Sequence, residues 1–416
     1  MLRNKEIDNH AEPGFPKIVM ATTLLLLALL AIPLLSSLLP FKEFHGYIRE
    51  IVAQAWGRDA DGAWTNGRNG YYEDLMQNTD SHLTRRTPVE WLMMGKSARN
   101  AAQRTDIYRY GGFLVYRGKP NLHLANTVLG PTRTNSYGFF DYEHTLQKPP
   151  GVRRIAIFGD SITRGLWLQR KDRYSTLLQE KLNSQDGGNF EVLNFAVTGY
   201  RLTQTFDSAV EDAPTFHPDV YVITLTELTI GSSWADHIKQ LVDQGEDLKY
   251  DPIREVVKES GLRKGDSVEQ AQAKLAPYRI ALTRELLRRL NKRAQQQSAK
   301  MIIALVPAAE GIDDSEYYAR EVDDCVQGLN IPVVDLMDTF NGIDPERVRR
   351  NWYDSHPDAL GDSMIADNLY RKLRENPDAW AAITGEPSDP KNSTKTAHLS
   401  LAKTVKHQLS GGRNVN

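Results

Sequence analysis

Two widely separated segments carry residue types that together could perform acyl transfer. A Gly-Asp-Ser tripeptide ending at Ser161 follows a short apolar run, and a serine at such a strand-to-helix turn can be exposed over the edge of a sheet. Far downstream, Asp354 and His356 precede the last expected helix. A serine nucleophile needs a base to accept its proton, and that base needs a partner that fixes its tautomer. Ser161, His356 and Asp354 are therefore candidates for nucleophile, base and orienting acid, although turns often use Gly-Asp-Ser for structural reasons alone.

A third segment offers a backbone hydrogen-bond donor. Gly199 closely follows a second apolar run, and a glycine after a strand lets the backbone approach a ligand and can present its N–H to an oxyanion. The backbone N–H of Ser161 can serve in the same way. For Gly199 considered alone, a plain turn glycine remains the alternative interpretation.

These residues can act together only if the intervening chain brings them to one place. Five apolar, β-branched runs predict strands at 154–158, 192–197, 220–225, 301–306 and 332–336. Helical spacing of apolar residues predicts helices at about 173–183, 268–298 and 360–374, the second as one long helix. Strands that alternate with helices indicate a parallel sheet covered on both faces, with ligands bound beyond the carboxyl ends of the strands.

Taken in this order, the motifs resemble the SGNH (GDSL-type) hydrolase family over about residues 130–375. Asn135–Phe139 before the first strand and Pro218 at the start of the third also look like features of its bacterial members. The resemblance implies a flavodoxin-like three-layer α/β/α fold with a parallel five-stranded sheet. It also implies an esterase or acyl-transfer site with Ser161 as nucleophile, His356 as base and Asp354 as its partner. The N–H groups of Ser161 and Gly199 would then form the oxyanion hole.

Two features depart from the family pattern. The family places a Gly-x-Asn-Asp element after the third strand, whereas residues 225–231 of this chain contain no asparagine. One oxyanion donor is therefore missing, and we expect either that a hydroxyl of Thr226 or Thr229 replaces it or that a Leu228→Asn substitution would restore it. The spacing of Asp354 and His356 is also one residue shorter than in many members. An irregular loop would allow it, or a backbone carbonyl would orient the imidazole instead.

Composition excludes several other classes of protein. The 51 Lys and Arg residues against 53 Asp and Glu give a net charge of −2, so no whole-chain electrostatic footprint points to nucleic acid as a partner. The single cysteine, Cys325, forms neither an internal disulfide nor a Cys-rich zinc site. His217, His237 and the acidic residues at 312–324 lack metal-ligand spacing, and no phosphate-binding or dinucleotide-binding glycine motif occurs. We therefore expect no metal and no cofactor.

One segment near the N-terminus is long and apolar enough to span a bilayer. Residues 18–41 carry no charge and include ten leucines, and a helix of this length covers roughly 36 Å. The bias of basic residues, three before the segment and two close behind it, places the N-terminus in the cytoplasm. A cleaved signal peptide and a buried soluble helix are the alternatives. The sequence thus predicts a cytoplasmic start (1–17), a signal anchor (18–41), a juxtamembrane stem (42–111), a hydrolase-like domain (112–385) and a disordered tail (386–416).

The resulting hypothesis is an anchored serine esterase or acyl transferase on the outer side of a bacterial inner membrane. Its expected partners are the membrane, through one helix, and an ester-bearing small molecule, glycan or lipid. Two hypotheses from other classes remain. One is a non-catalytic binding module that keeps the fold and cleft, and the other is an envelope assembly factor that acts through its stem. The charged stretch at 231–268 is expected to be either a substrate-selecting insertion near the strand ends or a solvated excursion.

Overall fold

The computed structural model describes residues 107–127, 130–309, 315–351 and 354–386. The anchor predicted at 18–41, most of the predicted stem and the tail after residue 386 lie outside these ranges. Among the helices within them, none is both long enough and apolar enough to cross a bilayer.

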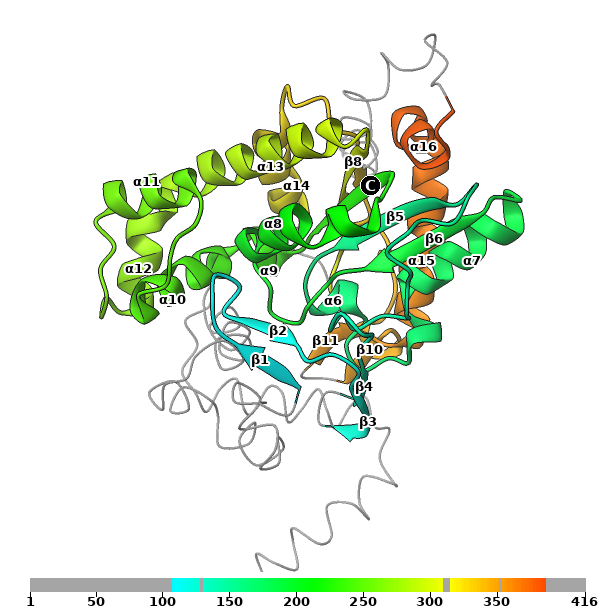
Figure 1. The fold of residues 1–416 in the computed structure, drawn as a ribbon, viewed down its shortest axis with the longest axis horizontal. Coiled ribbons are helices and arrows are strands. Elements are labelled where there is room, and N and C mark those ends of the chain that lie inside the picture. Colours follow the sequence, from blue (N-terminus) through cyan, green and yellow to red (C-terminus); the bar gives the residue numbers. More distant parts are fainter. Residues whose placement is uncertain (1–106, 128–129, 310–314, 352–353, 387–416) are drawn as a thin grey trace, which may run out of the picture. The chain divides into compact units, whose positions relative to one another are not determined.

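Five parallel strands form the central sheet (Figure 1). They are β5 (Arg153–Phe158), β6 (Phe190–Asn194), β7 (Val220–Leu225), β8 (Lys300–Leu305) and β9 (Val333–Asp335). Their spatial order is β6-β5-β7-β8-β9, which is the flavodoxin-like order 2-1-3-4-5. The parallel five-stranded sheet expected from the sequence is confirmed. Strand β6 ends earlier than expected because the Asn194 side chain accepts the N–H of Ala196 and so begins a turn.

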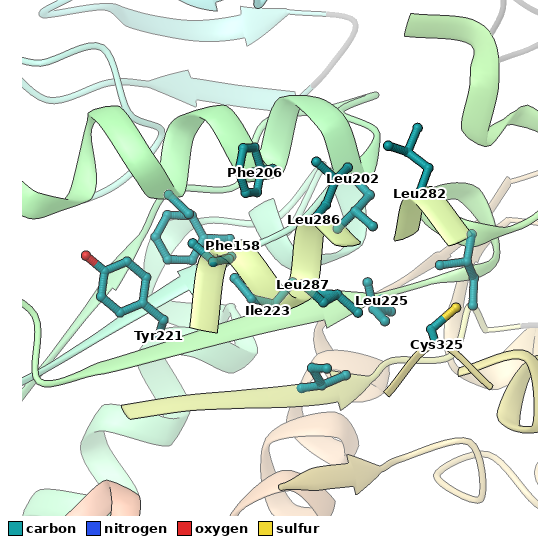
Figure 2. Close-up of a cluster of buried hydrophobic side chains, with 14 of the residues drawn as sticks. Phe158, Leu202, Phe206, Tyr221, Ile223, Leu225, Leu282, Leu286, Leu287 and Cys325 are labelled. Atoms are coloured by element: carbon teal, nitrogen blue, oxygen red, sulfur yellow. The ribbon is translucent and has the colours of Figure 1, made fainter. Parts of the chain in front are cut away.

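Helices cover both faces of this sheet, which makes three layers. One face is covered by α7 (Tyr174–Gln185), α15 (Ala359–Glu375) and α16 (Pro377–Thr384). The other is covered by α8 (Leu202–Glu211), α13 (Arg279–Gln296) and α14 (Ser315–Val326). Strand alternation divides the side chains of β5 between the two cores: Ile155 and Ile157 join the first, and Ala156 and Phe158 join the second. Figure 2 shows the second core, where leucines of α8 and α13 pack on β7.

The segment between β7 and β8 is a folded helical insertion. It contains α9 (Glu227–Ile230), α10 (Asp236–Gln244), α11 (Asp251–Ser260) and α12 (Val268–Leu275) before α13. Apolar residues of α10 to α12 join the core that lies under α8 and α13, so the insertion packs one side of its helices against this core. The single long helix predicted at 268–298 is wrong. A 3-10 turn at Ala276–Tyr278 interrupts it, because Pro277 has no N–H to donate and its ring crowds the preceding turn.

Three short antiparallel pairs lie outside the central sheet in the described part of the chain. They are β1 (Tyr108–Tyr110) with β2 (Tyr116–Gly118), β3 (His123–Thr127) with β4 (Gly130–Arg133), and β10 (Arg349–Asn351) with β11 (Asp354–Pro357). The β1–β2 hairpin packs on Leu166, Val197 and Tyr200, which belong to loops that follow β5 and β6. It therefore crosses the boundary at residue 111 that the sequence suggested between stem and hydrolase-like domain.

Candidate active site

Ser161 occupies a tight turn at the carboxyl end of β5. It is the first residue of the short helix α6 (Ser161–Arg164), and the Asp160 side chain caps that helix by accepting the N–H of Ile162 at 2.9 Å. Gly159 must lack a side chain here, since a Cβ would lie 2.0 Å from Thr224 Oγ1. Each residue of the Gly-Asp-Ser tripeptide thus has a structural role. Gly159 allows the close approach of Thr224, Asp160 caps α6, and Ser161 places its hydroxyl at the start of that helix.

The structure brings Ser161, His356 and Asp354 into one continuous hydrogen-bonded array. His356 Nε2 lies 2.7 Å from Ser161 Oγ, and His356 Nδ1 lies 2.5 Å from Asp354 Oδ1. A carboxylate can only accept, so Nδ1 carries the proton that faces Asp354. Nε2 of the neutral imidazole is then the acceptor for the serine hydroxyl. Ser161 and His356 are both buried.

The short spacing of Asp354 and His356 is accommodated by a short strand. Both residues lie in β11, and its pairing with β10 shifts register between the Asn351–Asp354 and Arg349–Pro357 pairs. Asp354 Oδ1 also accepts the backbone N–H of His356 at 3.1 Å, and the carbonyl of Ser355 between them accepts the N–H of Ala309 at 2.8 Å. The strand therefore fixes the imidazole, and its carboxylate partner, against the sheet.

The electrostatics of the array keep Asp354 ionised. Burial opposes its charge, but the adjacent His356 and the two hydrogen bonds from that residue outweigh burial, and they hold the pKa of Asp354 below its usual value. Asp160, on the other side of Ser161, behaves differently. Burial raises the pKa of Asp160 despite hydrogen bonds from Thr226 and Ile162. The pKa values of the two carboxyls thus shift in opposite directions, and Asp354 is the one that faces the imidazole.

Gly199 lies in a loop that runs beside α6. Val197 N–H donates to Gly159 O at 3.2 Å, and the guanidinium of Arg164 donates to Thr198 Oγ1 at 2.6 Å. Gly199 has φ of +78°, which favours glycine, and its carbonyl accepts from Arg201 at 3.1 Å. Among the backbone-to-backbone hydrogen bonds of the described residues, none has the Gly199 N–H as its donor. The loop thus holds a backbone donor next to the helix that begins at Ser161.

The hydroxyls that were expected to replace the missing asparagine are engaged elsewhere. Thr226 Oγ1 donates to Asp160 Oδ2 at 2.5 Å, so its only proton is used. Thr229 Oγ1 accepts the N–H of Thr226 and donates to the carbonyl of the same residue, both at 2.8 Å. The expectation that Thr226 or Thr229 supplies an oxyanion donor is therefore not supported. Both threonines instead close the turn after β7 onto the cap of α6.

His237 proves to be a structural histidine. It is fully buried, with Nδ1 2.7 Å from the Thr203 hydroxyl and Nε2 2.6 Å from the carbonyl of Phe113. Burial lowers its pKa to about 3, so the ring is neutral and links α10 to α8 and to the β1–β2 hairpin. In the described ranges, no cluster of His, Cys, Asp or Glu is arranged to hold a metal ion.

A buried carboxyl joins the helix after His356 to the helix after Ser161. Asp362 in α15 accepts the N–H of Tyr174 in α7 at 2.9 Å through Oδ2, and Oδ1 has no hydrogen-bond partner. Burial raises its pKa from 3.8 to about 8, although that hydrogen bond and the charge of Arg173 oppose the rise. The folded protein therefore keeps a proton here that the unfolded chain loses above about pH 4.

Because the folded protein keeps this proton, its free energy of unfolding should depend on pH. Because the unfolded state binds fewer protons between about pH 4 and 8, Asp362 destabilises the fold progressively over that window and by a constant amount above it. Asp362→Asn keeps the acceptor without the charge. We expect it to gain about 2–4 kcal/mol over wild type at pH 8 and little at pH 4, measured by urea unfolding. Asp367→Asn, an exposed change on the same helix, is the control and should follow the wild-type curve. If the free energy of unfolding varied with pH in the same way in all three proteins, the raised pKa of Asp362 would be contradicted.

Comparisons with known proteins add solved structures but no sequence relatives. No family model matches the sequence, and no curated protein matches it. TesA is 15% identical and is similar over 54% of this chain and 99% of its own, with a TM-score of 0.34. The psychrotrophic esterase EstA from Pseudoalteromonas sp. is 14% identical and is similar over 54% of this chain and 97% of its own, with a TM-score of 0.36. Axe2, an acetylxylan esterase from Geobacillus stearothermophilus, is 17% identical and is similar over 53% of this chain and 94% of its own, with a TM-score of 0.37.

Proposed function

We propose that this protein is a serine ester hydrolase or acyl transferase of the SGNH type. The observation that carries the proposal is the array Ser161–His356–Asp354, with heavy-atom distances of 2.7 and 2.5 Å, at the carboxyl end of a parallel sheet. A serine hydroxyl, a neutral imidazole and an ionised carboxylate in this order are what nucleophilic acyl transfer requires. The array is built from β5, α6 and β11, and it needs no metal or cofactor to explain its geometry.

In the proposed reaction, Ser161 Oγ forms a bond to the ester carbonyl carbon while His356 Nε2 takes the hydroxyl proton. The carbonyl oxygen becomes an oxyanion that accepts from backbone N–H groups, and Asp354 stabilises the resulting imidazolium. When the ester C–O bond breaks, His356 returns the proton to the departing alcohol and an acyl-serine remains. Water or a second alcohol then attacks this ester with the same base, which gives hydrolysis or transfer respectively.

The substrate class follows from the proposed location. An anchor at 18–41 with its N-terminus in the cytoplasm would place the catalytic domain outside the inner membrane. Ester-bearing carbohydrates or lipids of the envelope are the substrates that such a position favours. A reporter fused after Asn416 should then be active only outside the cytoplasm, and activity inside would overturn this orientation.

Reaction with a fluorophosphonate probe tests the proposed chemistry directly. The full chain, in membranes or detergent, should incorporate one equivalent of probe, and mass spectrometry should place it on the peptide that contains Ser161. Heat-unfolded protein is the control, because an unactivated serine does not react. A folded protein that neither labels nor hydrolyses p-nitrophenyl acetate would refute the enzymatic function.

A non-catalytic binding module is the second candidate. The observation in its favour is the turn after β7, which has no asparagine and whose two threonine hydroxyls are already engaged. Loss of one oxyanion donor can reduce a rate by about 10²–10³-fold. Binding of an acetylated glycan without turnover or labelling would favour this candidate over the enzyme.

A further inference from the structure

The loop that contains Gly199 is held by the aromatic hairpin β1–β2. Tyr116 OH donates to the carbonyl of Thr198 at 2.7 Å, and Tyr200 OH donates back to the carbonyl of Tyr116 at 2.8 Å. Tyr116, Thr198 and Tyr200 are all buried. Two reciprocal hydroxyl-to-carbonyl bonds therefore connect the hairpin to the loop, and one of them ends on the residue that precedes Gly199.

The bond from Tyr116 fixes the orientation of a single peptide plane. The Thr198 carbonyl and the Gly199 N–H belong to the same peptide group, which is planar and trans, so the two point in opposite directions. A hydroxyl that holds the Thr198 carbonyl toward the hairpin consequently holds the Gly199 N–H away from it. The next carbonyl, that of Gly199, is held separately by Arg201. Glycine at φ of +78° would otherwise let this plane rotate easily.

The support behind Tyr116 is rigid and its hydroxyl stays a donor. His237 ties the hairpin at Phe113 to α8 and α10, and edge-to-face rings of Tyr108 and Tyr200 flank Tyr116. Burial, together with the neighbouring tyrosines, raises the pKa of Tyr116 well above its usual value. The phenol is therefore neutral over the working range of an enzyme and keeps the proton that it donates to the Thr198 carbonyl.

We propose that Tyr116 is a positioning residue of the oxyanion hole, because its hydroxyl sets the peptide plane that aims the Gly199 N–H at the reacting carbonyl oxygen. This inference rests on the proposed esterase function and extends it to a residue outside the family-like motifs. It also bears on the missing third-block donor. With fewer donors in the hole, the orientation of each remaining one has a larger effect on the rate.

Tyr116→Phe tests the proposal, with Tyr200→Phe as its matched control. Each change removes one buried hydroxyl from the same reciprocal pair, but only the first releases the Thr198 carbonyl. We expect Tyr116→Phe to lower kcat for p-nitrophenyl acetate by about 10–100-fold with KM within twofold, because the donor acts on the transition state. Phosphonylation of Ser161 should slow by a similar factor. Tyr200→Phe should stay within threefold in both assays, while both variants unfold at similar urea concentrations.

The possible outcomes distinguish a failure of the role proposed for Tyr116 from a failure of the proposed esterase function. If wild type turns over the ester and both variants lose activity equally, or neither loses it, Tyr116 has only a structural role and the proposal is wrong. A rise in KM with unchanged kcat would contradict it as well, since that indicates lost substrate binding. If wild type neither labels nor turns over, the proposed function itself fails, and an oxyanion-positioning role for Tyr116 fails with it.

Discussion

Ser161→Ala is expected to lower kcat for a small activated ester by at least about 10⁴-fold and to abolish fluorophosphonate labelling. The variant removes the only atom that forms the acyl bond, the hydroxyl oxygen that lies 2.7 Å from His356 Nε2. Residual activity would come from water placed near the remaining donors. Steady-state kinetics, with mass spectrometry of the labelled peptide, measure both effects.

Ser208→Ala is the matched control for this prediction. Ser208 is a second buried serine, located in α8, and its hydroxyl donates to Asp212 at 3.0 Å. Replacing Ser208 also removes one buried hydroxyl oxygen, but it leaves the Ser161–His356–Asp354 array unchanged. The kcat of this variant should therefore stay within about twofold of wild type. A Ser161→Ala protein that keeps a tenth or more of the wild-type activity would show that another group performs the chemistry.

The sheet could be predicted because its central strands are buried on both faces. The cores of β5, β7 and β8 then appear in the sequence as nearly continuous apolar runs, and the helices between the runs dictate parallel neighbours. Local features that depend on one residue were harder to predict. The leucine pattern across 268–298 continues through Pro277, so periodicity indicated one helix where the backbone makes two. The β1–β2 hairpin was missed because its strands have three residues each.

The candidate triad could be predicted because its members lie in short motifs that directly follow or precede regular elements. Its supporting contacts could not. Thr226 reaches Asp160 across 66 positions of sequence and Tyr116 reaches Thr198 across 82, and neither pair has a motif. Both contacts are side-chain hydrogen bonds whose partners are known only once the loops are placed. A buried tyrosine in a short hairpin gives no signal in a single sequence that separates it from a core residue.

Asp354→Asn is expected to lower kcat by about 10³–10⁴-fold while preserving the fold. The amide has nearly the same shape, but it is neutral and cannot stabilise the imidazolium that forms when Ser161 gives up its proton. Its NH₂ group can also face the ring, which favours the tautomer whose protonated Nε2 cannot accept from Ser161. Asp358→Asn, four residues along the chain, is the control: Asp358 caps α15, and asparagine caps helices equally well.

The ionisation of Asp354 limits what can cause a loss of activity in acid. The depressed pKa of Asp354 keeps its carboxylate charged at neutral and mildly acidic pH. Neutralisation of Asp354 should therefore contribute nothing to any loss of wild-type activity between about pH 7 and 5, which profiles of kcat/KM against pH measure. An Asp354→Asn protein with more than a tenth of wild-type activity would show that β11 alone orients the imidazole.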